Sequence, residues 1–294
     1  MPIARVNGID TYYEDEGEGV PVLFIHGGFG GAESALYWKQ STFKGVLPLD
    51  RFRVITYDRR GGGRSSFVKG HYVLKDLAKD ARALLGHLGV ERSIIVGDSL
   101  GGLVAQRFGL DYPDAVESLL LAETGSTIFQ VPKKVEAILL ATRVVPVRPL
   151  FRFIKPKVLE PEFYDPLGPL SAEEIAARRK HHETYKARLR ELPDSELYRY
   201  SMGLLRNYAA FANADLSAEA GELTMPVDIM HGTADRVVRF ETGAALLQHI
   251  PHARFHELPG LGHGLFYYPE GRELAQRIIE ERAAALTPIK VAAG

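Results

Sequence analysis

The amino-acid sequence predicts a doubly wound α/β fold, in which helices cover both faces of a mostly parallel sheet. Short apolar runs alternate with helix-like segments along most of the 294 residues, and this alternation is typical of such folds. The runs are continuously hydrophobic, as expected for parallel strands that are buried on both faces. Hydrophobic residues make up 46% and charged residues 25% of the chain, which provides enough apolar surface for a large core.

The expected elements follow one another in a regular order. An antiparallel hairpin at the sheet edge is expected over residues 3–14, because Asn7-Gly8 separates two strand-like runs. Helical patterns lie between the later strands, as at residues 74–88 and 100–110. The segments with the hydrophobicity of buried strands are residues 20–25, 52–57, 93–96, 118–122 and 227–230, and residues 253–258 are also strand-like.

The alternation of strands and helices stops between residues 125 and 222. Three segments there have helical patterns, at 131–145, 171–192 and 194–212, and prolines interrupt the chain between the first two. So long a helical stretch after a core strand suggests an inserted lid. We therefore expect an α/β core of residues 1–124 and 223–294 and a helical cap of residues 125–222. The alternative is a peripheral helical decoration of the core.

Charge and cysteine content exclude several classes of function. Lys and Arg number 36 and Asp and Glu 37, a net charge of −1, so no basic field points to nucleic acid. The chain has no cysteine, which excludes disulfides, thiolate metal sites and a Cys nucleophile. Without a signal-like or membrane-spanning apolar run, we expect a cytoplasmic protein with no membrane partner. We expect a small-molecule substrate, no metal or organic cofactor, and either a monomer or a homodimer.

The sharpest chemical signal is the segment 97–101 (GDSLG), which matches G-x-S-x-G. It directly follows a predicted strand and directly precedes a predicted helix, which is the context of a nucleophile elbow. The glycines on either side allow strand and helix to approach closely while Ser99 occupies a strained, exposed turn. The N-terminus of the helix then favours negative charge that develops at the site. The alternative is an ordinary strand-to-helix turn.

A serine nucleophile needs a base, and the base needs a third group that orients it. In a nucleophile-elbow enzyme the chain order is Ser, acid, His. His263 lies between two glycines after a predicted strand, where an imidazole has no helix or strand to support. Asp235 follows the strand at residues 227–230 and is the expected acid, with Glu123 as the second choice. The alternatives are a structural histidine and an Asp235 that caps the helix near Phe240.

The oxyanion hole needs two backbone N–H groups that point at the developing negative charge. One is expected from Leu100, the residue after the nucleophile. The other is expected from the glycine-rich loop at residues 26–31, with Gly28 as the first choice and Phe29 as the second. This loop lacks the Lys-Ser/Thr of a P-loop and the full G-x-G-x-x-G pattern, which argues against nucleotide binding.

With these motifs in place, the sequence resembles α/β-hydrolase fold enzymes that carry a helical cap. Five of the family's motifs occur in the family's order: the oxyanion loop at 26–30, the D-x-R-G-x-G-x-S turn at 58–65, the elbow at 97–101, the acid loop at 232–235 and the histidine loop at 262–263. The resemblance covers nearly the whole chain outside the cap. It implies a mostly parallel eight-stranded sheet.

The resemblance also narrows the chemistry, because Ser99 stands where haloalkane dehalogenases and epoxide hydrolases carry an aspartate. It implies a carboxylesterase-like serine hydrolase that cleaves an ester-type bond of a small hydrophobic substrate through an acyl-enzyme. A carbon–carbon bond hydrolase, a proline iminopeptidase-like peptidase and a ligand receptor on the same fold are the alternatives. A peptidase needs acidic cap residues for an α-ammonium group, and the candidates are Glu160, Glu162 and Asp165.

Candidate substrate contacts lie beside the predicted nucleophile and base. They are Phe29, Asp98 and Phe266. Asp98 departs from the family pattern, since many relatives carry His, Asn, Phe or Trp next to the nucleophile. Apolar residues of the cap, such as Leu139 and Phe151, are expected either to line an apolar pocket or to pack the cap onto the core.

Overall fold

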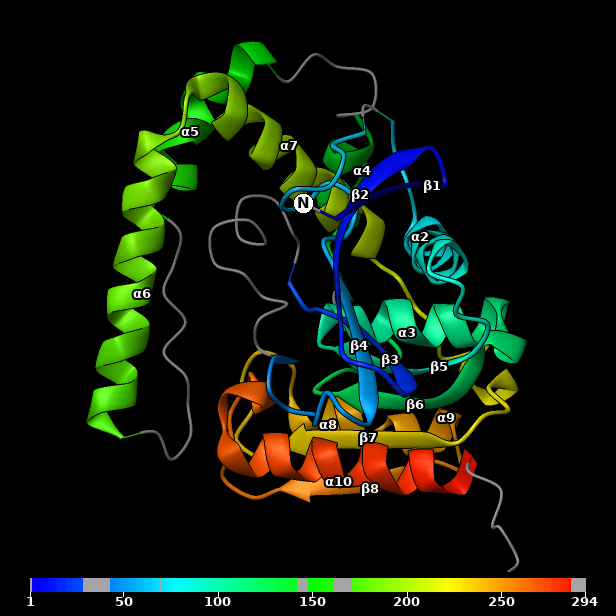
Figure 1. Ribbon diagram of the computed structural model, residues 1–294. Helices are drawn as coiled ribbons and strands as arrows, with labels where there is room; N and C mark the ends of the chain where they lie inside the picture. The colour runs from blue at the N-terminus through cyan, green and yellow to red at the C-terminus, as the bar shows by residue number, and fades with distance from the viewer. Residues whose placement is uncertain are drawn as a thin grey trace, which may run out of the picture.

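The computed structural model describes residues 2–28, 43–68, 70–128, 130–141, 148–160 and 171–286. They contain an eight-stranded sheet in the order β1-β2-β4-β3-β5-β6-β7-β8 (Figure 1). The strands are β1 (Ile3–Val6), β2 (Ile9–Glu16), β3 (Val20–Ile25), β4 (Phe52–Tyr57), β5 (Ser93–Asp98), β6 (Val116–Ala122), β7 (Val227–Gly232) and β8 (Arg254–Leu258). The predicted α/β fold with a mostly parallel eight-stranded sheet is confirmed.

Strand direction separates the edge hairpin from the rest of the sheet. β1 and β2 pair in antiparallel fashion, as do β2 and β4, whereas all pairs from β4 to β8 are parallel. Asn7 and Gly8 at the hairpin turn have φ of 48° and 77°, the left-handed backbone that a tight hairpin turn requires. The expected hairpin is therefore confirmed. The carboxyl ends of the parallel strands meet at one edge, where α/β folds place their sites.

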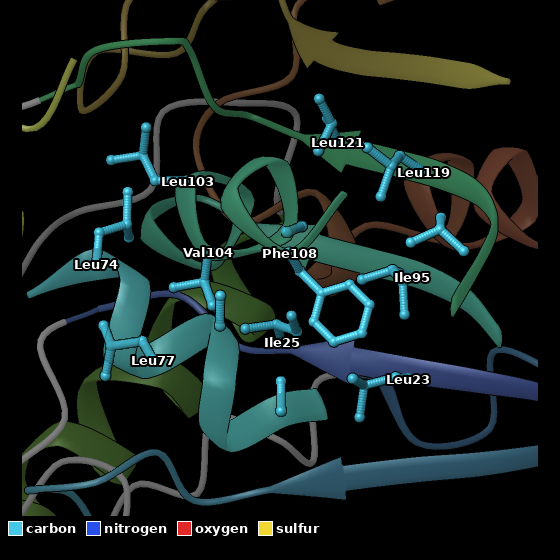
Figure 2. Close-up of a cluster of buried hydrophobic side chains, with 14 of the residues drawn as sticks. Leu23, Ile25, Leu74, Leu77, Ile95, Leu103, Val104, Phe108, Leu119 and Leu121 are labelled. Atoms are coloured by element: carbon cyan, nitrogen blue, oxygen red, sulfur yellow. The ribbon is translucent and has the colours of Figure 1, made fainter. Parts of the chain in front are cut away.

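Helices cover both faces of this sheet. They are α2 (Leu74–His87), α3 (Leu100–Asp111), α8 (Phe240–Ala244), α9 (Leu246–His249) and α10 (Pro269–Leu286). Leu23 and Ile25 of β3 join the core formed with α2 and α3 (Figure 2), whereas Val22 and Phe24 join the opposite core with α10. Because both faces are buried, β3 is hydrophobic at successive positions. Among the described helices none is both long and apolar enough to cross a membrane.

Four more helices lie between β6 and β7 in the chain: α4 (Lys133–Ala141), α5 (Phe151–Leu159), α6 (Ala172–Glu191) and α7 (Asp194–Phe211). Three of them fall inside the segments with predicted helical patterns. α5 was not predicted, because Pro156 lies inside it and proline disfavours a helix interior. In Figure 1, α6 stands apart from the sheet at the left. The division into core and cap stays a prediction.

The apolar residues of these helices have different surroundings. Phe151 is buried and packs in a small cluster with Leu189 and Leu197. Leu139 is also buried, whereas Phe153 is 65% exposed. Packing therefore accounts for Phe151.

The glycine-rich turn after β4 is held by its own charges. Asp58 Oδ2 accepts hydrogen bonds from the backbone N–H and from Nε of Arg64, both at 2.9 Å. Gly63 has a φ of 55°, and a Cβ there would lie 2.3 Å from Asp58 Oδ2, so the carboxylate packs directly on its backbone. Asp58 and Arg64 are therefore paired within the turn, whereas Arg60 of the same segment pairs with Asp80 of α2 at 2.6 Å.

Near the amino-terminal ends of β7 and β8, away from the glycine-rich loops, the buried carboxylate of Asp228 links β7, β8 and α10. Asp228 accepts hydrogen bonds from Arg254 Nε at 2.7 Å, His256 Nε2 at 2.9 Å and Arg282 Nε at 2.7 Å. Burial alone would raise the pKa of Asp228, but the hydrogen bonds from His256, Arg254 and Arg282 outweigh it and lower the pKa to about 2. The ionised form is therefore favoured by folding.

Replacing Asp228 with asparagine is expected to lower the free energy of unfolding at pH 7 by about 2 kcal/mol. Because the folded-state pKa lies below the unfolded-state value, this stabilisation is complete above about pH 4 and is lost as the pH falls towards 2. Denaturant unfolding of wild type and variant between pH 3 and 8 measures the difference. Asp114→Asn, at an exposed position, is the control; equal stability of wild type and Asp228→Asn at pH 7 would contradict the prediction.

Candidate active site

Ser99 occupies a sharp turn between β5 and α3. Its φ of 50° and ψ of −119° are unfavourable for a residue with a side chain. The turn is possible because two glycines allow close contact: a Cβ on Gly97 would lie 2.7 Å from Gly102 Cα, and one on Gly101 would lie 2.0 Å from the carbonyl oxygen of Ile25. The structure thus has the strand–turn–helix geometry of a nucleophile elbow at the predicted position.

His263 and Asp235 are hydrogen-bonded to each other. His263 Nδ1 lies 2.7 Å from Asp235 Oδ2, although 28 positions separate the two residues in the chain. The other carboxylate oxygen, Asp235 Oδ1, accepts the backbone N–H groups of Val237 at 2.8 Å and Val238 at 2.9 Å. The loop after β7 therefore fixes the carboxylate, and the carboxylate orients the imidazole.

The protonation state of this pair follows from its surroundings. Burial alone would raise the pKa of Asp235, but hydrogen bonds from His231 and His263, the charge of His263 and the N–H of Val238 lower the pKa to about 2. Asp235 is therefore a carboxylate at neutral pH and can only accept a hydrogen bond. His263 Nδ1 must carry the proton, which leaves Nε2 as the basic nitrogen.

Arg59 holds Gly27 and Gly28, the first glycines after β3. Its guanidinium is buried over the ring of Phe211, with Cζ 5.1 Å from the ring centroid. Arg59 Nη2 donates to the carbonyl oxygens of Gly27, at 3.2 Å, and of Gly28. In a trans peptide the N–H points away from the carbonyl oxygen, so holding the carbonyl of Gly27 directs the N–H of Gly28 away from Arg59.

A depression of about 400 Å³, open to solvent, brings these groups together. Its lining residues are Gly27, Gly28, Asp98, Ser99, Glu123, His263, Gly264, Phe266 and Tyr267. Asp235 lies behind His263, and Leu100 supplies the first backbone N–H of α3. The oxyanion and substrate-contact candidate Phe29 lies outside the described residues. Phe266 is 2% exposed and packs on Phe24 and Phe43, so it is also part of the core.

The surroundings of Glu123 could hardly be predicted from the sequence. Its buried carboxyl group accepts the backbone N–H groups of Gly264 at 2.7 Å and Leu265 at 2.9 Å through Oε2, while Oε1 lies 3.7 Å from His263 Nε2. The pKa of Glu123 is raised well above its usual value by burial, and further by the neighbouring Asp98, to which it is hydrogen-bonded. Asp235, not Glu123, holds His263 Nδ1. The position of Glu123 directly after a buried strand was its one signal.

Glu123, Asp235 and His263 place three ligand-type atoms within 4.8 Å of one another. Their polar atoms are, however, committed to hydrogen bonds: His263 Nδ1 to Asp235, and Glu123 Oε2 to two backbone N–H groups. This arrangement suits the holding and movement of protons.

Comparison with known proteins identifies the family. The family model described as alpha/beta hydrolase fold matches residues 20–269. The chain belongs to this family. The hydrolase and esterase relatives described next support a hydrolase.

Several named relatives match most of the chain. A putative carbamate hydrolase from Cronobacter sakazakii is 28% identical over 83% of this chain and 84% of that protein. A bifunctional esterase/perhydrolase from Acinetobacter calcoaceticus is 26% identical over 90% of this chain and 92% of its own. Among solved structures, the enol-lactonase from Burkholderia xenovorans LB400 has a TM-score of 0.68 at 22% identity, covering 96% of this chain and all of that one. This structural similarity supports the fold.

Proposed function

We propose that this protein is a serine hydrolase that cleaves an ester-type bond of a small hydrophobic substrate through an acyl-enzyme. The observation that carries the proposal is the pairing of His263 Nδ1 with Asp235 at 2.7 Å, in a depression that Ser99 also lines. A histidine held in this tautomer beside an elbow serine is the arrangement that activates a hydroxyl group.

The reaction follows from the roles of these groups. Ser99 Oγ attacks the substrate carbonyl while His263 Nε2 takes its proton, and the backbone N–H groups of Leu100 and Gly28 stabilise the oxyanion. The carbonyl–oxygen bond to the leaving alcohol then breaks as His263 returns the proton to that oxygen. Water, deprotonated by His263, then attacks the acyl carbon of the resulting ester. The bond to Ser99 Oγ breaks as His263 returns the proton to this oxygen, which releases the acid and restores the enzyme.

The lining of the depression restricts the substrate. Among the described lining residues, Asp98 and Glu123 carry carboxyl groups, and neither lysine nor arginine is present. An anionic substrate would meet like charge there, so a neutral or cationic ester is favoured. Phe266 and Tyr267 supply apolar surface beside Ser99.

Hydrolysis of p-nitrophenyl esters of increasing acyl length tests this proposal, together with labelling by a serine-directed fluorophosphonate and mapping of the labelled peptide. Multiple turnover on short or medium acyl chains and a label on Ser99 are expected. A label on another residue would contradict the assignment of the nucleophile. Turnover of aminoacyl arylamides without ester turnover would replace the esterase by the peptidase, and a single burst without turnover would favour the receptor.

The peptidase finds little support among the described residues. Glu160 pairs with Lys186 at 3.0 Å and with Arg190, both on α6, so its charge is already matched. Glu162 and Asp165, the other candidates for holding an α-ammonium group, lie outside the described residues.

A further inference from the structure

Two carboxyl groups from neighbouring strands meet beside Ser99. Asp98 ends β5, and its register partner on β6 is Ala122, the residue before Glu123. Burial, the negative charge of Asp98 and a side-chain hydrogen bond with Asp98 raise the pKa of Glu123. Carboxylates only accept hydrogen bonds, so such a contact requires that one of the two groups is protonated.

The surroundings of Asp98 agree with a proton between the two groups. Asp98 Oδ2 accepts the backbone N–H of Gly27 at 3.3 Å. Asp98 Oδ1 is shielded from solvent, and no N–H or hydroxyl donor of the described residues reaches it. A carboxyl O–H from Glu123 is the donor that this buried oxygen lacks.

Glu123 also supports the loop that carries the base. Its Oε2 accepts the N–H groups of Gly264 and Leu265, the two residues that follow His263. Glu123 has an unfavourable backbone φ of 43°, and its side chain is buried, with 1% exposed. Backbone strain at a buried residue persists only where the surroundings enforce it, and here the hydrogen bonds to the histidine loop do so.

We propose that Glu123 is a positioning residue that shares one proton with Asp98, and that in this state it holds the His263 loop while leaving His263 Nε2 free to take the proton of Ser99. The inference rests on the proposed function, since it assigns to His263 the role of the base. It goes beyond that function by adding a pair of residues that controls when the base is available.

The charge of Glu123 can affect the protonation of His263 because Glu123 Oε1 lies 3.7 Å from His263 Nε2. A protonated Glu123 carries no charge there. An ionised Glu123 would stabilise the imidazolium form of His263, which cannot accept a proton from serine. The charged and titratable groups that face Glu123 from the described elements around it are Asp98, Asp235 and His263. Burial favours the protonated form of Glu123 most, and Asp98 favours it further through its charge and a hydrogen bond.

Two isosteric variants separate the roles. Asp98→Asn removes the neighbouring negative charge, so Glu123 ionises and the pKa of the His263 imidazole rises by about one unit or more. Glu123→Gln keeps an acceptor for the histidine loop and a donor for Asp98, so the pKa of His263 does not rise. The double variant Asp98→Asn/Glu123→Gln reverses the rise that Asp98→Asn causes.

The measurement is the ¹⁵N NMR titration of the His263 imidazole in the four proteins, together with the pH profile of fluorophosphonate labelling. The acid limb of labelling is expected to move to higher pH in Asp98→Asn alone. A fall of about one unit in Glu123→Gln would overturn the proposal, because Glu123 would then be ionised in the wild type. No rise in Asp98→Asn would also overturn it, because Asp98 would then not be the group that shares the proton of Glu123. The titration needs no substrate, so this outcome is distinct from a failure of the proposed esterase activity, which the ester panel reports.

Discussion

Replacing Ser99 with alanine is expected to reduce kcat on the best p-nitrophenyl ester on the order of 10⁶-fold, the loss seen when a triad serine is removed. The variant lacks the oxygen that forms the acyl-enzyme, so His263 and the N–H groups of Leu100 and Gly28 retain no nucleophile to assist. Residual activity would come from binding and oxyanion stabilisation of direct water attack.

The Ser99→Ala variant is also expected to fold normally. The elbow depends on close contacts at Gly97 and Gly101, not on the hydroxyl group, and alanine meets the same backbone requirement as serine. Circular dichroism and the unfolding midpoint check this point. Ser195→Ala, on an exposed part of α7, is the matched control and should keep wild-type kcat. If Ser99→Ala kept more than about one tenth of the wild-type kcat, the assignment of Ser99 as the nucleophile would be wrong.

The sequence was most informative where one residue type is physically required. Continuous apolar runs indicated buried parallel strands, as the two-sided burial of Val22 to Ile25 in β3 illustrates. The glycines of the elbow were equally informative, since a Cβ on Gly101 would collide with the backbone of β3. Such steric requirements restrict the residue type at single positions, and this restriction is visible in the sequence. The fold and the geometry around Ser99 could therefore be predicted.

Contacts made across distant segments were not predictable in the same way. Arg59 belongs by sequence to the D-x-R-G-x-G-x-S turn, yet its guanidinium donates to the carbonyls of Gly27 and Gly28, 32 and 31 positions away. Glu123 was considered only as a second-choice acid, because its contacts to Asp98 and to the loop at 264–265 depend on how three strands come together. Helix α5 was missed because Pro156 outweighed the helical pattern around it.

Replacing Asp235 with asparagine is expected to lower kcat by about 10⁴-fold without unfolding the protein, as in other triads. Asp235 Oδ1 accepts the N–H groups of Val237 and Val238, so the side-chain oxygen of the asparagine must keep that position. Its NH₂ group then faces His263 Nδ1 and donates to it. The imidazole must place its proton on Nε2, and in that tautomer it cannot accept the proton of Ser99.

Glu123 is not expected to compensate for the loss of Asp235. Its carboxyl group lies on the Nε2 side of His263 and is held by two backbone N–H groups and by Asp98, so it cannot reach Nδ1 without breaking all three contacts. The tautomer is directly measurable: ¹⁵N NMR should show the proton on Nδ1 in the wild type and on Nε2 in Asp235→Asn. Asp215→Asn, which removes an exposed carboxylate, should change neither the tautomer nor kcat. An Asp235→Asn variant that keeps the Nδ1 proton and loses less than about tenfold in kcat would show that another group orients the base.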